Sequence, residues 1–421
     1  MLFNSVVFLY AFLPIAYLVF WNLKTRRQRY VWLTVTGYAF YSVWDYRFCA
    51  LMAFSTVVSY LAGLGFLKWD HSQSRRRWCL IVPIVVDLGL LGFFKYTGML
   101  LDTARAMAER AGIPVTVPVV HIVLPIGISF YTFHTISYIV DSYRRTIKPT
   151  RDFFEFSCYV SLFCQLVAGP IVRFRQIEAD LENIASIDRK AFWESGWSFF
   201  VIGMMKKVLI ADTIAKVIDP ALANYDRLST IGAWATMVGY TYQLYFDFSG
   251  YSDMAVGLGR LFGLRIPQNF ASPYKATDPS DFWRRWHISL STCLRDYLYV
   301  SLGGNRRFMY RNLLLTMLIG GLWHGASWTF VVWGAYHGLL LVIYRRFSAT
   351  WDALPLLGRR AGMFFAVIIG WVFFRATSFT MAGAMLDKMF FWQPGEPIPG
   401  ALTLAALLIL CTGLTQFAPN T

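Results

Sequence analysis

A histidine inside an apolar stretch is the residue of this sequence that most strongly suggests chemistry. His324 lies in the apolar run 313–343, within the local sequence GGLWHGASW at 320–328. An ionisable side chain is costly in hydrocarbon, so His324 is a candidate functional residue. It follows Arg311 by 13 residues, about 20 Å along a helix, which predicts bilayer mid-depth if Arg311 marks an interface. Protonation there would cost desolvation energy, so the neutral imidazole, which can act as a base, is favoured.

The second candidate is His287, which lies in segment 280–302 among aromatic residues and arginines. This amphipathic pattern predicts an interfacial segment that lies at the membrane surface or dips into the helix bundle. The residues alone leave two interpretations of His287 equally open. It is either an ordinary histidine of a helix whose arginines snorkel to the surface, or part of a polar wall facing His324.

The other four histidines carry weaker signals. His134 has aromatic neighbours in an apolar run, which favours a buried, hydrogen-bonded side chain. We interpret His71 and His121 as solvated or structural. His337, on a different face of the helix expected over 313–343, is interpreted as helix packing or a partner-binding group.

Two carboxylates, Asp247 and Asp253, occur in the glycine-containing sequence DFSGYSD. Carboxylates within a membrane mark a polar pathway or an internal salt bridge, which Arg260 or Arg265 could supply. The sequence has no HExxH metal motif, no phosphate-binding loop and no GxSxG nucleophile motif. The six cysteines have no paired spacing and are expected to be small core residues, with no metal site. The chain thus offers a base without an evident nucleophile of its own.

The elements that position these residues must be membrane helices. The chain has 421 residues, of which 57% are hydrophobic and 15% charged, and its mean hydropathy is +0.47. These values are typical of a polytopic membrane protein with, by length, about ten to twelve spans or half-spans. The apolar runs are 6–21, 30–44, 48–67, 78–94, 119–140, 153–172, 193–210, 231–248, 313–343, 364–374 and 401–414.

The basic residues predict how the helices are oriented. The first run is followed by Lys24, Arg26, Arg27 and Arg29, so we expect the N-terminus outside and this loop in the cytoplasm. Basic loops at 68–77 and 144–151 fall on the same side; after residue 172 the orientation stays open. The net charge of +15 is explained by these loops, so no nucleic-acid partner is expected.

Breakers within apolar segments predict a tunnel. Pro125 with Gly127, Gly169 with Pro170, and Gly250, Gly257 and Gly259 interrupt runs that would otherwise span the membrane. Non-helical backbone at membrane depth is tolerated where it lines a cavity or is buried in protein. With no long soluble insert or repeat, we expect one integral membrane domain over 1–421.

Five stretches together resemble the membrane-bound O-acyltransferase family, in the bacterial branch of alginate O-acetylation and teichoic acid D-alanylation proteins. They are LPIGISFYTF at 124–133, QLVAGPI at 165–171, FDFSGYSDMA at 246–255, DFWRRWHISL at 281–290 and GLWHG at 321–325. The alginate type is the closer match, and the resemblance runs from residue 3 to about residue 375. Two departures are Thr292-Cys293, where a tryptophan is expected, and the end at Thr421, beyond which alginate-type members usually extend.

The resemblance implies an all-α fold of tilted helices ringed around a central tunnel, with His324 catalytic and His287 a second important residue. Further tunnel candidates are Trp323, Trp286, Arg285, Asp253, Ser252, Gln165 and His134. It also implies an inner-membrane enzyme, without a permanently bound cofactor, that moves an acetyl group from cytoplasmic acetyl-CoA, or an acyl group from another thioester, to an extracytoplasmic acceptor. That acceptor is a polysaccharide or a periplasmic, SGNH-hydrolase-like partner protein.

Three alternatives stay open. D-alanyl transfer from a carrier protein to teichoic acid would use the same base. A transporter of acylated lipid or polysaccharide would move substrate without consuming thioester, although the paired broken repeats typical of transporters are missing. A scaffold that only anchors a partner enzyme would leave His324 dispensable.

Overall fold

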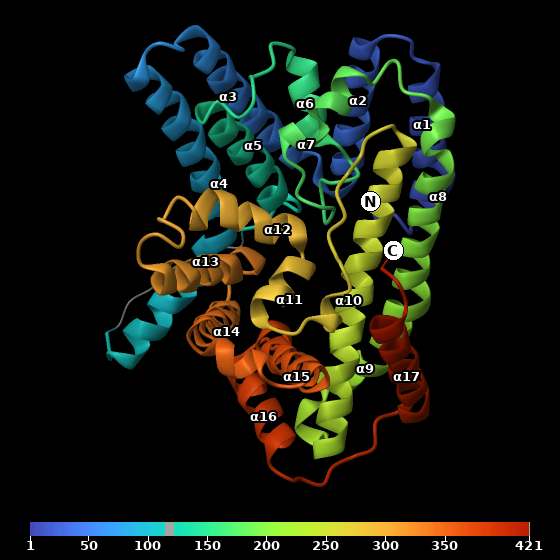
Figure 1. The fold of residues 1–421 in the computed structure, drawn as a ribbon, viewed down its shortest axis with the longest axis vertical. Coiled ribbons are helices and arrows are strands. Elements are labelled where there is room, and N and C mark those ends of the chain that lie inside the picture. Colours follow the sequence, from blue (N-terminus) through green and yellow to red (C-terminus); the bar gives the residue numbers. More distant parts are fainter. Residues whose placement is uncertain (114–121, 421) are drawn as a thin grey trace. The chain divides into compact units, whose positions relative to one another are not determined.

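The computed structural model describes residues 1–113 and 122–420. Within these ranges the regular elements are helices, and β structure is limited to one isolated bridge between Leu228 and Glu396. The all-α prediction is therefore confirmed (Figure 1). The residues form two compact units: unit 1 is Met1–Ser198 with Ala255–Pro267, and unit 2 is Phe199–Met254 with Gln268–Thr421. The prediction of a single domain stays a prediction.

Unit 1 is built from the N-terminal helices. A π-helical segment, Phe8–Phe12, leads into α1, and most of α8 also belongs to this unit. The bounds are α1 Leu13–Asn22, α2 Arg26–Asp45, α3 Arg47–Lys68, α4 Gln73–Arg110, α5 Ile128–Tyr143, α6 Phe153–Ser161, α7 Phe174–Glu182 and α8 Arg189–Met205.

Unit 2 carries the remaining helices, most of α10 and both leading histidine candidates. A π-helical segment, Lys206–Ala211, joins α8 to α9, and another, Leu294–Tyr299, follows α12. The bounds are α9 Asp212–Ala223, α10 Thr230–Leu261, α11 Pro279–Arg285, α12 Ile288–Cys293, α13 Met309–His324, α14 Trp328–Asp352, α15 Leu356–Arg375, α16 Phe379–Phe390 and α17 Ala401–Phe417.

Two of the expected interruptions occur in unit 1. Pro125 and Gly127 lie in non-helical backbone before α5, and Gly169 and Pro170 lie in the non-helical stretch between α6 and α7.

The third interruption was predicted wrongly, because α10 continues as one helix through Gly250, Gly257 and Gly259 (Figure 1). Close packing explains Gly250: a β-carbon there would lie 2.7 Å from the carbonyl oxygen of Gly203 in α8. Gly250 thus allows α8 and α10 to approach closely and does not interrupt α10.

Three described helices are long and apolar enough to cross a membrane: α3, α4 and α15. Two shorter apolar helices are Phe8–Asn22 and α17. Together they fit the prediction of a polytopic membrane protein. The number of spans and the central tunnel remain predictions.

Candidate functional site

His324 is the last residue of α13, directly before a break in the chain. The sequence suggested one continuous apolar run over 313–343, but two helices form, separated by extended backbone at Gly325. Ser327 begins the second helix, since its Oγ accepts a hydrogen bond from the Thr329 N–H at 3.3 Å. His324 and His337 therefore lie on different helices, which corrects the expectation that one helix carries both.

Helices α13 and α14 pack backbone against backbone. A β-carbon at Gly321 would lie 2.3 Å from the Phe330 carbonyl oxygen, and one at Gly334 would lie 2.4 Å from that of Met317. Neither position has room for a side chain. The close crossing brings Trp333 of α14 against His324, with ring centroids 5.0 Å apart and planes at 86°.

Aromatic side chains surround the His324 ring. Besides Trp333, its ring contacts Trp323 at 5.0 Å and Phe374 of α15 at 5.2 Å between centroids. His324 is nevertheless partly exposed. A mainly apolar surrounding with partial access suits a neutral imidazole that must still meet a substrate.

His287 lies close to His324, with the two ring centroids 6.3 Å apart. It occupies the break between α11 and α12, where its backbone adopts φ 45° and ψ 54°, an uncommon conformation for a non-glycine residue. Its side chain is 1% exposed, packed edge-on against Phe248 at 4.7 Å. The structure thus brings together the two histidines that the sequence ranked first.

The predicted interfacial segment 280–302 is not one helix. It consists of α11, α12 and the π-helical turns 294–299, with His287 at the first break. The helix is thus interrupted at His287, and the interfacial position of the segment stays a prediction.

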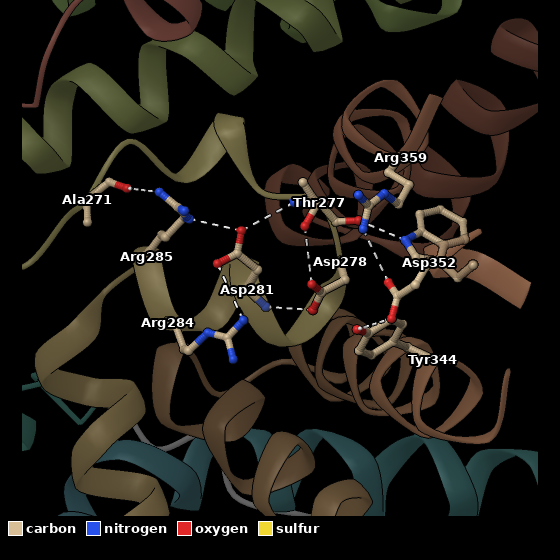
Figure 2. A network of polar contacts seen from close by, with 10 residues as sticks. Ala271, Thr277, Asp278, Asp281, Arg284, Arg285, Tyr344, Asp352 and Arg359 are labelled. Carbon is tan, nitrogen blue, oxygen red and sulfur yellow. Dashed lines mark hydrogen bonds and ion pairs between the residues drawn. The ribbon is translucent and has the colours of Figure 1, made fainter. Parts of the chain in front are cut away.

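A polar network holds α11 in place (Figure 2). Asp278 caps the helix by accepting from the Asp281 N–H at 2.8 Å, and Asp281 in turn accepts from Arg285 Nε at 3.0 Å. Arg285 also donates to the Ala271 carbonyl at 3.2 Å. Arg284 lies at 3.5 Å from the other Asp281 oxygen. These contacts give Arg285 a structural task; its role in a tunnel stays a prediction.

Two other candidates from the sequence lie near this turn. Trp286 is 3% exposed and stacks on Phe282 at 5.7 Å, among the aromatic residues of the core of unit 2. Ser252 is 1% exposed, and its Oγ accepts from Asn269 Nδ2 at 3.3 Å. Trp286 thus packs in this core and its place in a tunnel stays a prediction, whereas Ser252 is joined to His287 through Asn269.

The carboxylates of α10 pair with lysines, not with the arginines suggested above. Lys206 Nζ lies 2.6 Å from Asp253, and Lys207 Nζ lies 2.6 Å from both Asp247 and Asp212. Arg265 instead pairs with Asp180 in unit 1. The prediction of internal salt bridges is therefore confirmed, but their basic partners are lysines where arginines had been expected.

The Lys206–Asp253 pair should be important for stability. Both side chains are mostly buried, at 13% and 11% exposure. Because Asp253→Asn removes the negative charge beside a poorly solvated ammonium group, we expect a loss of up to about 3–5 kcal/mol in the free energy of unfolding, measurable by thermal denaturation in detergent. Asp247→Asn is the matched control, since Asp247 is 38% exposed and Lys207 keeps Asp212. Equal losses in the two variants would contradict this account.

The remaining candidates from the sequence belong to unit 1. His134 is fully buried, with its ring 5.6 Å from that of Tyr159, and Gln165 Nε2 donates to the Tyr159 carbonyl at 2.6 Å. They share Tyr159 as a neighbour within unit 1. Their place in a tunnel stays a prediction.

The other three histidines of the chain are His71, His121 and His337. His71 is exposed, and His121 lies outside the described residues. His337 is fully buried between aromatic rings, with Trp333 at 5.0 Å and Trp283 at 5.3 Å. Burial rules out the partner-binding interpretation of His337 and leaves packing. Among the described residues, no three His, Cys, Asp or Glu side chains gather as a metal-binding group.

Sequence reasoning missed several residues of the site. Asn269, whose side-chain oxygen lies 3.2 Å from His287 Nδ1, is a single asparagine in a loop. Neither hydrophobic periodicity nor a known motif marks this position. Trp333 and Phe374 reach His324 only through helix crossings. Lys206 could have been found, because two lysines at the end of an apolar run need acidic partners.

Comparison with known proteins identifies the class of protein to which this helical chain, with its histidine pair, belongs. Residues 120–392 match the membrane-bound O-acyltransferase family, MBOAT. The chain belongs to this family and is an acyltransferase.

Among curated relatives, the chain is 45% identical to "Probable alginate O-acetylase AlgI" of Azotobacter vinelandii, over 99% of this chain and 86% of the relative. It is 36% identical to "Peptidoglycan O-acetyltransferase" of Helicobacter pylori, over 92% and 80% of the two chains. "Teichoic acid D-alanyltransferase" of Streptococcus thermophilus is more distant, 30% identical over 52% and 56%. The alginate type suggested by the sequence motifs is therefore confirmed as the nearer one of these.

Proposed function

We propose that this protein transfers an acetyl group from acetyl-CoA to a hydroxyl group outside the cytoplasm, as a step in polysaccharide O-acetylation. The observation that carries the proposal is the histidine pair: partly exposed His324 at the end of α13, 6.3 Å between ring centroids from buried His287. A base and a second polar group at this separation can flank one reacting hydroxyl.

The reaction needs one base at the hydroxyl. His324 takes the proton from the acceptor hydroxyl while the hydroxyl oxygen attacks the thioester carbonyl carbon. The new carbon–oxygen bond forms, the carbon–sulfur bond breaks, and the thiolate leaves and is protonated by the imidazolium. The products are the acetyl ester and free coenzyme A, and His324 returns to its neutral form.

The acceptor class follows from the relatives. Their names refer to alginate and to peptidoglycan, both extracytoplasmic polymers that carry sugar hydroxyl groups. We place the enzyme in the inner membrane with its N-terminus outside, so that the basic loops after α1, after α3 and after α5 face the cytoplasm. The acetyl group passes to the polymer directly or through a periplasmic, SGNH-hydrolase-like partner.

The test uses purified full-length protein, labelled acetyl-CoA and candidate acceptors. We expect label to leave acetyl-CoA and to appear as a base-labile ester on the acceptor. D-Alanyl transfer instead predicts turnover only with an aminoacylated carrier protein. Transport predicts movement of substrate with the thioester unchanged. Absence of label from every acceptor, with activity from a charged carrier, would replace our proposal with the second function.

His287→Ala should lower turnover while leaving folding and acetyl-CoA binding in place, because we expect His287 to orient the acceptor and His324 to be the base. We expect a loss of about tenfold to a hundredfold, at or below the lower end of general acid–base effects. His71→Ala, at an exposed loop position, is the control and should retain full activity. A His287→Ala enzyme with unchanged kcat would return His287 to a packing role.

A further inference from the structure

Asn269 holds the turn that contains His287 with both its backbone and its side chain. Its carbonyl oxygen accepts from the Ile288 N–H at 2.9 Å. Its side-chain oxygen accepts from the Ser289 N–H at 3.0 Å and from Ser289 Oγ at 2.9 Å. The same oxygen lies 3.2 Å from His287 Nδ1. Asn269 and His287 are 2% and 1% exposed, so water does not compete for these contacts.

These contacts decide which atom of the Asn269 amide faces the histidine. A backbone N–H can only donate, so the side-chain atom of Asn269 that faces Ser289 N must be the oxygen. The amide nitrogen then points to Ser252 Oγ, 3.3 Å away. The orientation of the amide follows from the backbone and needs no assumption about the ring.

The same logic fixes the proton on His287. Because the amide oxygen can only accept, Nδ1 must carry the hydrogen that joins the two residues. Burial against Phe248 and Trp323 favours the neutral ring, in which Nε2 then holds the lone pair. His287 Nε2 is buried and has no hydrogen-bond partner among the described residues. The turn therefore presents a single acceptor atom that is left for a ligand.

We propose that Asn269 is the positioning residue of His287, which holds the proton on Nδ1 and leaves Nε2 to accept a hydrogen bond from a second hydroxyl group of the acceptor, not from the one whose proton His324 removes. The proposal rests on the acyl-transfer function proposed above and narrows it. A ring nitrogen without a hydrogen cannot stabilise negative charge on the thioester carbonyl. His287 thus orients the acceptor so that its reacting hydroxyl, with its proton, faces His324. A different group must stabilise the negative charge on the thioester carbonyl oxygen.

The tautomer can be measured directly by NMR of protein labelled with ¹⁵N at histidine, because protonated and unprotonated ring nitrogens have well-separated shifts. Comparison with His287→Gln identifies the signals of His287. In the wild-type protein we expect a protonated Nδ1 and an unprotonated Nε2. The opposite tautomer in the folded wild-type protein would overturn the proposal, whatever any variant does.

Two variants of Asn269 separate positioning from packing. Asn269→Leu removes the acceptor, and we expect a mixture of tautomers with a fall in turnover of about tenfold or more, since a misplaced imidazole proton costs up to about 10⁴-fold in serine proteases. Asn269→Asp keeps an oxygen facing Nδ1 and should preserve the tautomer. Ser289→Ala is the matched control: it removes one donor to Asn269 and leaves the His287 contact. An unchanged Nδ1–H tautomer in folded Asn269→Leu would contradict the assignment.

The spectrum also keeps this inference apart from the proposed function. If His324→Ala remained fully active, the acyl-transfer mechanism would fail, yet the ¹⁵N signals would still report the state of His287. Conversely, a wrong tautomer in an active enzyme would remove Asn269 from its proposed role and leave His324 as the base.

Discussion

Replacing His324 with alanine is expected to abolish measurable acetyl transfer while the protein still inserts and folds. General-base assistance contributes about 10²- to 10⁴-fold in rate, and the chain offers no evident internal nucleophile to provide another route. The His324 ring contacts Trp323, Trp333 and Phe374, so its removal leaves a gap lined by aromatic residues that costs some stability. The measurement is release of coenzyme A from labelled acetyl-CoA by purified enzyme.

The control for this loss is His324→Gln, which fills most of the gap and keeps a polar side chain but is no base. If loss of the base is the cause, the glutamine variant should be as inactive as the alanine variant and closer to wild type in thermal stability. Size-exclusion elution and melting of both variants establish that they are folded. Full activity in either folded variant would eliminate His324 as the base.

Gly321→Ala is expected to cause the second large effect, because it forces apart the two helices that shape the site. The added β-carbon would lie 2.3 Å from the Phe330 carbonyl oxygen and 3.1 Å from the Gly334 α-carbon, both backbone atoms. Alanine favours a helix by about 1 kcal/mol over glycine, whereas overpacking costs about 1–3 kcal/mol or more. We expect a net loss of stability and, since Trp333 moves relative to His324, a severalfold or greater loss of activity.

The matched control is Gly383→Ala in α16, where a β-carbon would meet nothing within 4 Å. There the helix propensity acts alone, so the free energy of unfolding should rise by up to about 1 kcal/mol. Opposite signs for the two substitutions in thermal denaturation support the backbone contact. A stabilising effect at Gly321 would show that α13 and α14 are not held this closely.

The sequence was sufficient to predict the helical class and the two leading histidines, because both rest on local signals. Apolar runs near spanning length predict membrane helices, and an ionisable residue in such a run is conspicuous. The pairing of His324 with His287 came from resemblance to a family, since they lie 37 residues apart. Nothing in their spacing requires them to meet.

What the sequence did not reveal depends on contacts between distant segments. Asn269 has no distinguishing neighbours, and its importance arises only when the loop after α10 folds against the His287 turn. The glycines of α10 suggested a break, but a glycine is also favoured where two helices touch, and Gly250 illustrates the second case. The break after His324 had a signal in the sequence, because Ser327 is a residue type that commonly caps the start of a helix. The apolar residues on both sides of it made the run look continuous.

The position of His324 at the final turn of α13 has an electrostatic consequence. The carbonyl groups at the end of a helix carry a partial negative charge, which stabilises a nearby positive charge by about 0.3–1 kcal/mol at exposed sites and by more where water is scarce. During transfer the ring holds the acceptor's proton for a moment and becomes a cation in apolar surroundings. The helix terminus offers that cation a fixed dipole, which is already oriented before the reaction begins. Because α13 ends at His324, the helix end also stabilises the imidazolium form of the base.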